Sequence, residues 1–104
     1  MDRSLSRWSD RYRTKGRIRG EMMKARILIV DDELSVREFF EILLEKEGYE
    51  VVTALDAPDA LRIMKEQSLD LVVTDLQLKN GDGMSLLKEV KRLQADTPVV
   101  MITA

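Results

Sequence analysis

Cysteine and histidine are both absent from this sequence. Without cysteine the chain can form neither a disulfide nor a thiolate metal site, and without histidine it lacks the most common metal ligand and general base of proteins. A metal ion would therefore be held by oxygen atoms, which favours magnesium, manganese or calcium. No apolar run approaches the length of about 20 residues that crosses a bilayer, and the basic N-terminus lacks the apolar core of a signal peptide. We expect a cytoplasmic protein that makes no contact with a membrane.

Charge is distributed unevenly along the 104 residues. Residues 1–24 carry eight basic and three acidic side chains, whereas residues 25–104 carry nine basic and sixteen acidic ones. We interpret residues 1–24 as a basic, disordered extension and residues 25–104 as one folded unit, because the periodic hydrophobic pattern begins at that boundary. The Arg-rich extension could contact nucleic acid, but basic composition alone is weak evidence. We prefer a solvated tail, or translated sequence upstream of a true start at Met22 or Met23.

Short apolar runs that are typical of buried strands alternate with segments of helical periodicity. We predict strands over residues 25–30, 49–54 and 69–74, and a fourth strand opened by Pro98. Each intervening segment is long enough for a helix of about ten residues or more. Strict alternation of this kind implies right-handed crossovers and a parallel sheet with helices on both faces, which is the α/β class.

The first predicted helix has signals at both ends. Ser35 and Glu38 fit the S-x-x-E capping box, in which each side chain satisfies an unpaired backbone N–H. Gly48 follows the helix in the C′ position. One apolar face is predicted from residues spaced by three and four positions: Val36, Phe39, Phe40, Leu43 and Leu44.

The other two helices are predicted in the same way. Asp56 can cap the second helix, with Pro58 in its first turn and the end near Gln67. The third helix follows a turn at residues 80–83. The inward residues are predicted as Ala60, Leu61 and Met64 in the second helix, and as Met84, Leu87, Val90 and Leu93 in the third.

Three acidic residues and one hydroxyl stand where the predicted strands end. Asp31 and Asp32 follow the first strand. Asp75 ends the third strand and Thr103 the fourth. Because parallel strands place their carboxyl ends at one edge of the sheet, we expect these groups to share one pocket. Two carboxylates about 5 Å apart repel by roughly 3 kcal/mol at an effective dielectric of 20, so the pocket is suited to Mg²⁺.

Each of these residues also has an ordinary structural explanation. The paired acids could simply cap a helix, Asp75 could be a turn residue, and Thr103 could be an ordinary strand residue. In a shared pocket, however, an aspartate carboxylate can attack phosphorus to form an acyl phosphate, while a metal neutralises charge on the transferring oxygens. Phosphoryl transfer needs mainly positioning and charge stabilisation, so the absence of a histidine base is no obstacle. Thr103 could donate its hydroxyl to a phosphoryl oxygen.

Four stretches of the sequence share the pattern of one known family. They are I-L-I-V-D-D-E at 27–33, D-L-V-V-T-D at 70–75, D-G at 82–83 and V-V-M-I-T-A at 99–104. Together they resemble the receiver domains of response regulators in two-component signalling. The resemblance implies a flavodoxin-like, doubly wound parallel sheet of order 2-1-3-4-5. Here the order 2-1-3-4 is expected, with the fifth strand and the last two helices missing, so residues 25–104 would be a partial receiver domain.

The resemblance also implies a role for each site residue. Asp75 would accept a phosphoryl group from the phosphohistidine of a sensor histidine kinase. Asp32 and Asp75 would bind Mg²⁺ directly and Asp31 through water, with the backbone carbonyl of Gln77 completing the protein ligands. Thr103 would be the switch hydroxyl that moves toward the phosphate. An attached output domain, absent from these 104 residues, would control transcription; the ending at 99–104 looks most like receivers attached to AAA+ activators.

Two departures from the family pattern matter. Lys79 stands where the family usually has a proline after the phosphoacceptor, so the loop should be less rigid and Lys79 could lie near the phosphate. The fifth strand, with its phosphate-binding lysine and aromatic switch residue, is absent. Phosphorylation could survive this absence weakly, but transmission of the signal should not.

Two other functions fit parts of the pattern. Enzymes of the haloacid-dehalogenase type also use an aspartate nucleophile, Mg²⁺ and a strand-end hydroxyl, but their motif is Asp-x-Asp on the first strand. This chain instead has two adjacent acids, Asp31 and Asp32, followed by Glu33. Turnover of a phosphate ester, rather than one stoichiometric transfer, would distinguish an enzyme from a receiver. A pure interaction module would keep the fold without being phosphorylated; the full acidic set opposes this interpretation, and the missing lysine supports it.

The expected truncation leads to a prediction about behaviour in solution. Because the first helix lacks its usual neighbour and no helix covers the last strand, residues 1–104 should be unstable, aggregated or dimerised through exposed apolar surface. Size-exclusion chromatography and thermal melting measure these properties. A monomer that melts cooperatively would contradict the expectation.

Overall fold

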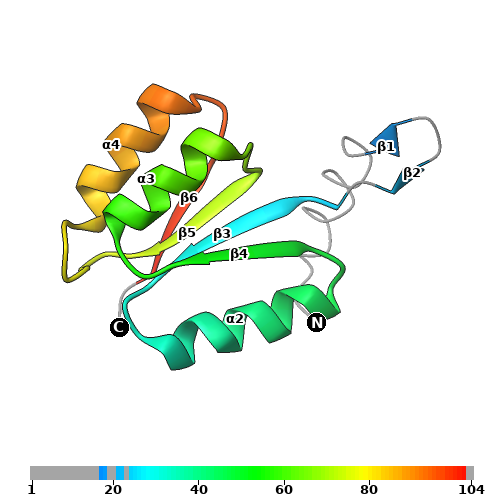
Figure 1. Cartoon of the computed structure of the whole chain (residues 1–104), viewed down its shortest axis with the longest axis horizontal. Coiled ribbons are helices and arrows are strands. Elements are labelled where there is room, and N and C mark those ends of the chain that lie inside the picture. The colour runs from blue at the N-terminus through cyan, green and yellow to red at the C-terminus, as the bar shows by residue number, and fades with distance from the viewer. Residues whose placement is uncertain (1–16, 19–20, 23, 103–104) are drawn as a thin grey trace.

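The computed structural model describes residues 17–18, 21–22 and 24–102. Four parallel strands form its main sheet, with helix α2 on one face and helices α3 and α4 on the other (Figure 1). The elements of this layered unit are β3 (Arg26–Val30), α2 (Leu34–Lys46), β4 (Glu50–Ala54), α3 (Ala57–Glu66), β5 (Leu71–Asp75), α4 (Gly83–Leu93) and β6 (Val99–Ile102). The strands lie in the order β4-β3-β5-β6. The predicted α/β class and the flavodoxin-like order 2-1-3-4 are therefore confirmed.

A second sheet of two short strands precedes the main sheet in the chain. β1 (Arg17–Ile18) pairs antiparallel with β2 (Glu21–Met22), so that Arg17 lies opposite Met22. The sequence did not predict these strands, because two residues are too few to show a periodic pattern. The remaining residues up to residue 23 lie outside the described part of the chain.

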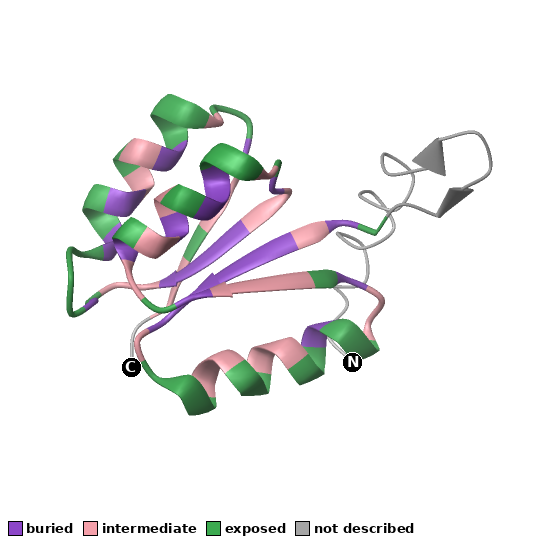
Figure 2. Cartoon of the chain, viewed as in Figure 1, coloured by how far each residue is buried: buried purple, intermediate pink, exposed green. Residues whose placement is uncertain are grey.

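Strand β3 is the centre of the main sheet. It pairs in parallel with β4 on one side and with β5 on the other, and residues 27–30 are completely buried (Figure 2). Leu28 and Val30 pack in the core beneath α3 and α4, while Ile27 and Ile29 pack in the core beneath α2. A strand that is buried on both faces has no polar alternation, which is why a continuous apolar run predicted it correctly.

Helix α2 starts earlier than the proposed capping box allows. Glu33 is the N-cap and makes no side-chain cap bond, so Ser35 lies inside the first turn and does not cap the helix. The capping prediction was wrong because Asp31 already holds the turn: its Oδ1 atom accepts the Glu33 N–H at 2.9 Å. The first helical hydrogen bond then runs from the Arg37 N–H to the Glu33 carbonyl. The predicted end is confirmed, since Gly48 follows the helix with a positive φ of 93°.

The face that α2 buries is narrower than predicted. Leu44 is buried, and Val36 and Phe40 are half-buried, whereas Phe39 is 60% and Leu43 41% exposed. The buried line follows residues four positions apart. A residue one position earlier is turned about 100° around the helix axis, away from the sheet.

Both helices on the opposite face begin at an aspartate cap. Asp56 accepts the Asp59 N–H at 2.9 Å, which confirms the predicted start of α3. Asp82 accepts the Ser85 N–H at 2.7 Å at the start of α4. The buried residues of α3 include Ala60 and Met64 as predicted, together with Ala57 and Ile63, while Leu61 is only partly buried.

The side of helix α4 that faces the core matches the prediction only in part: Val90 is buried as predicted, but Leu86 rather than Leu87 is the buried leucine. Its buried residues are Gly83, Leu86 and Val90. Two of the residues predicted to point inward are exposed instead: Met84 (49%) and Leu93 (36%). The sequence could not distinguish the two faces, because Leu86 and Leu87 are adjacent leucines and either can head a helical stripe.

The helices of the described chain are short. The longest, α2, has 13 residues. Among the described residues, none of the helices combines the length and apolar character that crossing a bilayer requires.

Two substitutions on α4 test which side faces the core. Leu86→Ala should lower the free energy of unfolding by about 2–5 kcal/mol, because it leaves a cavity at a fully buried position. Met84→Ala should change it by less than about 0.5 kcal/mol, because that side chain is largely exposed. Urea denaturation followed by circular dichroism measures both values. A larger loss for Met84→Ala would show that the face predicted from sequence was correct.

Candidate functional site

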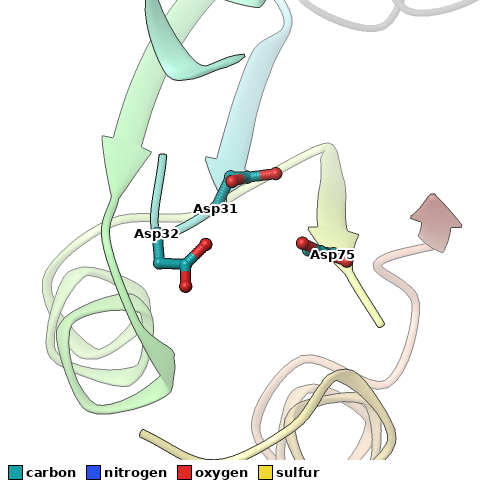
Figure 3. Close-up of side chains that lie close together, drawn as sticks. All are labelled: Asp31, Asp32 and Asp75. Carbon is teal, nitrogen blue, oxygen red and sulfur yellow. The ribbon is translucent and has the colours of Figure 1, made fainter. Parts of the chain in front are cut away.

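Three carboxylates meet at the carboxyl edge of the main sheet. Asp31 and Asp32 follow directly after β3, and Asp75 is the last residue of β5. Because β3 and β5 are parallel neighbours, with Val30 opposite Thr74, the two strands end side by side. Each aspartate offers an oxygen atom that lies within 4.8 Å of the others, and the three groups surround a common space (Figure 3). The predicted convergence of these three residues is confirmed.

Asp31 is the buried member of this acidic cluster, with 4% of its surface exposed. Its backbone N–H donates to the Ala54 carbonyl at 3.1 Å, and its Oδ1 atom accepts the Glu33 N–H at 2.9 Å. Burial raises the pKa of the Asp31 carboxyl, and the nearby negative charges of Asp75 and Asp32 raise it further. The bond from Glu33 opposes this rise and is not sufficient to cancel it. The surroundings of Asp31 therefore disfavour its negative charge.

Gln77 lies on the loop that follows Asp75. Gln77 is exposed, and its backbone N–H donates to the Asp75 Oδ1 atom at 3.3 Å. An isolated antiparallel bridge joins Gln77 to Asp82, the cap of α4. Gln77 is thus positioned next to the cluster, as the sequence predicted. Its proposed role as a ligand through the carbonyl remains a prediction.

The start of α4 packs tightly against the end of β5. The Gly83 N–H donates to the Leu76 carbonyl at 2.9 Å. A Cβ atom at Gly83 would lie 2.6 Å from the Asp75 carbonyl oxygen, which is closer than such atoms approach. Gly83 therefore allows the helix to begin beside the acidic cluster, and a larger residue would displace the strand end that carries Asp75.

Thr103, the predicted switch hydroxyl, lies outside the described residues. The structure describes β6 as far as Ile102, which lies opposite Asp75 in the sheet. The Leu76 N–H donates to the Ile102 carbonyl at 3.1 Å.

Arg37 contacts the cluster although the sequence analysis did not select it. Its Nη1 atom donates to the Asp31 carbonyl oxygen at 2.7 Å. One signal in the sequence could have found it. Arg37 lies near the start of a predicted helix that follows two acids, where the helix dipole favours negative rather than positive side chains.

The donor set fits a hard divalent cation. Within residues 24–102, the cluster formed by Asp31, Asp32 and Asp75 is the group of acidic side chains close enough together to share an ion. Carboxylate oxygens, joined by a backbone carbonyl and water, are the ligands that Mg²⁺ prefers. A cation would also offset the charge that raises the pKa of Asp31. Asp31, Asp32 and Asp75 are therefore the residues that could hold such an ion.

Comparison with known proteins identifies the family. A family model of the response regulator receiver domain matches residues 27–104, and the chain belongs to this family. It is 42% identical over 84 residues to the probable transcriptional regulator ycf27 of Cyanophora paradoxa, which covers 81% of this chain and 35% of that protein. It is 38% identical over 80 residues to the transcriptional regulatory protein GlrR of Escherichia coli (strain K12), which covers 77% of this chain and 18% of that protein.

The same fold occurs in a solved structure that contains Mg(2+)-BeF. The response regulator protein TrrA of Thermotoga maritima, in complex with Mg(2+)-BeF, matches with a TM-score of 0.73 at 34% identity, over 77% of this chain and 70% of that one. The chain thus spans well under half of the curated relatives named above and about two thirds of this structure. The family match confirms the resemblance found in the sequence, and it favours a receiver over an enzyme of the haloacid-dehalogenase type.

The raised pKa of Asp31 leads to a prediction about pH and stability. A carboxyl whose pKa is higher in the folded than in the unfolded chain keeps its proton longer when folded, so its contribution to stability falls as pH rises through this interval. Asp31→Asn removes that cost and keeps an oxygen for the Glu33 N–H. In metal-free buffer at neutral pH, this variant should therefore melt at a higher temperature than the parent, and the difference should shrink as the pH is lowered below the ordinary pKa of aspartate.

Thermal melts with EDTA across the acidic pH range measure this difference. Asp96→Asn is the matched control, because it removes one negative charge from an exposed position away from the cluster. A lower melting temperature for Asp31→Asn at neutral pH would contradict the charge cost inferred for Asp31.

Proposed function

We propose that this chain accepts a phosphoryl group on Asp75 from the phosphohistidine of a sensor histidine kinase, in a reaction that depends on Mg²⁺. The observation that supports this most directly is the meeting of Asp31, Asp32 and Asp75, with oxygen atoms within 4.8 Å of one another, in a member of the receiver family. The resemblance to receiver domains selects Asp75 as the acceptor. It ends a strand and is only partly buried, as Asp32 also is, so its carboxylate can be approached from solvent.

The other residues of the site would bind the metal and orient the acceptor. Asp31, Asp32 and Asp75, with the backbone carbonyl of Gln77, are the proposed ligands. When bound, Mg²⁺ would neutralise negative charge on the phosphoryl oxygens during transfer. The Gln77 N–H already bonds to Asp75 Oδ1, and this bond leaves the second carboxylate oxygen for the reaction.

The transfer itself needs no general base from this chain. A carboxylate oxygen of Asp75 forms a bond to phosphorus, and the bond between phosphorus and the kinase imidazole nitrogen breaks. The electron pair of that bond returns to the imidazole nitrogen, which takes up a proton from water. Because a carboxylate has no proton to lose when it attacks, the absence of histidine from the sequence is consistent with this chemistry. Thr103 is proposed to donate its hydroxyl to the transferred group.

We further propose that phosphorylation controls an output domain and, through it, transcription. The curated relatives are named as transcriptional regulators, and each is much longer than this chain. In this proposal the kinase and the output domain are the partners of the receiver in the cytoplasm. A homodimer is a further possible assembly, and any contact with nucleic acid belongs to the output domain.

Incubation with acetyl phosphate tests the acceptor directly. In the presence of Mg²⁺, the mass of the intact chain should increase by one phosphoryl group, with release of acetate, and the adduct should be lost at alkaline pH, as expected of an acyl phosphate. Asp75→Asn should abolish the adduct, because an amide is a far weaker nucleophile than a carboxylate. EDTA should suppress it in the parent.

Asp96→Asn is again the control and should form the adduct like the parent. A stable adduct that persists in Asp75→Asn would place the modification elsewhere in the chain. The absence of any adduct in a folded parent with Mg²⁺ would count against the proposal. Catalytic turnover of a phosphate ester, in a separate assay, would instead indicate an enzyme.

A further inference from the structure

The start of α2 departs from the local rules of helix capping. Its N-cap, Glu33, makes no side-chain cap bond, and its first turn contains no acidic residue. The fourth residue of the helix is the positively charged Arg37. The helix dipole makes this end partially positive, so a cation here is unfavourable to the helix alone. Departures from local rules of this kind tend to occur where a residue serves a site.

Within residues 24–102, Arg37 also differs from the other arginines in what it binds. Arg26, Arg62 and Arg92 each form an ion pair with a carboxylate at the surface. Within residues 24–102, Arg37 takes part in none of the ion pairs. It is half-buried, and its guanidinium donates to the main-chain oxygen of Asp31 at 2.7 Å. A hydrogen bond from a charged donor is shorter and stronger than one between neutral groups.

The oxygen that Arg37 binds belongs to the peptide that joins Asp31 to Asp32. The orientation of this peptide determines the directions in which both side chains leave the backbone. A second bond, from the Glu33 N–H to Asp31 Oδ1, orients the first carboxylate. Asp75 is oriented separately, by the N–H of Gln77 on the loop that follows it. The Arg37 bond is thus the contact through which α2 holds the Asp31–Asp32 turn in place opposite Asp75.

We propose that Arg37 is a positioning residue of the acidic site: by anchoring the peptide between Asp31 and Asp32, it aims both carboxylates at the ion that they share with Asp75. This inference rests on the proposed function. Arg37 donates to a carbonyl and has no acceptor with which to bind a cation, so it acts through Asp31 and Asp32. Residues that orient metal ligands typically account for about tenfold or more in metal affinity.

The positive charge of Arg37 by itself would have the opposite effect on metal affinity. A guanidinium near the site repels a divalent cation, so its removal would tighten binding if charge were its main contribution. The two roles therefore give opposite signs, and the sign is the readout. Salt separates them further, because at 0.5 M KCl the screening length falls to about 4 Å and long-range repulsion is largely removed.

The test measures the binding of Mn²⁺, used as a spectroscopic substitute for Mg²⁺, by electron paramagnetic resonance of the free ion in titrations of the full chain. Arg37→Met should weaken binding by about tenfold, at both low and high salt. Arg37→Lys should recover most of the lost affinity, because it keeps a charged donor of similar reach. Arg62→Met is the control, since Arg62 is exposed on α3 and pairs only with Asp59 and Glu66, and it should bind Mn²⁺ like the parent.

Circular dichroism melts in EDTA distinguish positioning from a purely structural role. Arg37→Met with a lower melting temperature and unchanged Mn²⁺ affinity would overturn the proposal, as would tighter binding or a difference that disappears at high salt. If Arg37→Met does not fold, Arg37→Gln and Arg37→Lys give the same comparison with a smaller change in volume. A parent that binds no Mn²⁺ would overturn the proposed function together with this inference, whereas equal binding by parent and variants would overturn this inference alone.

Discussion

The parallel pairing of β3 with both of its neighbours is the constraint on which the site depends. Val30 lies opposite Ala54 on one side and Thr74 on the other, so the three strands reach the same edge of the sheet together. If β5 ran in the opposite direction, Asp75 would lie at the far end of a five-residue strand, about 13 Å from the end of β3. Parallel pairing in turn requires helical crossovers, and it therefore also accounts for the helices on both faces.

The same constraint brings like charges together in the acidic cluster, which lowers the stability of the fold. Burial and like charges together raise the pKa of Asp31, and nothing within the cluster neutralises it. The structure limits this cost with hydrogen-bond donors from the chain: a backbone N–H for Asp31, another for Asp75, and the Arg37 guanidinium on the peptide between the paired acids. A site that retains excess negative charge in this way is prepared to bind a cation, because the ion removes the repulsion that the fold only partly offsets.

The two faces of the sheet are covered unequally. Helices α3 and α4 pack against each other as well as against the sheet, whereas the main contacts of α2 among the described elements are with strands β3 and β4. A single helix buries one narrow line of side chains, so the residues on either side of that line remain exposed. Phe39 and Ile42 are each 60% exposed for this reason. Apolar exposure on this scale is consistent with a surface that binds another segment or partner.

Much of this molecule was determined by local sequence. The continuous apolar run at residues 27–30, the cap at Asp56 and the left-handed Gly48 each follow from the preferences of a few adjacent residues. The position of the acids at strand ends follows from the same local pattern. Strand order could be predicted as well, because the family resemblance and the rules for parallel sheets agreed.

Tertiary structure alone decided which sides of the helices face the core and how the site is held. Leu86 and Leu87 have the same chemistry, and only the packing of α4 against the sheet buries the first of them. Ser35 fits the sequence pattern of an N-cap, but the Asp31 side chain binds the Glu33 N–H, and the helix begins before Ser35. From the sequence, Arg37 would be expected to be a solvent-exposed helix residue, but in the structure its side chain donates to the Asp31 carbonyl. The packing of α4 depends on contacts between distant segments, about which local preference carries no information. The bonds to Asp31 span only two residues to Glu33 and six to Arg37, and the sequence alone does not determine which of several local partners forms them.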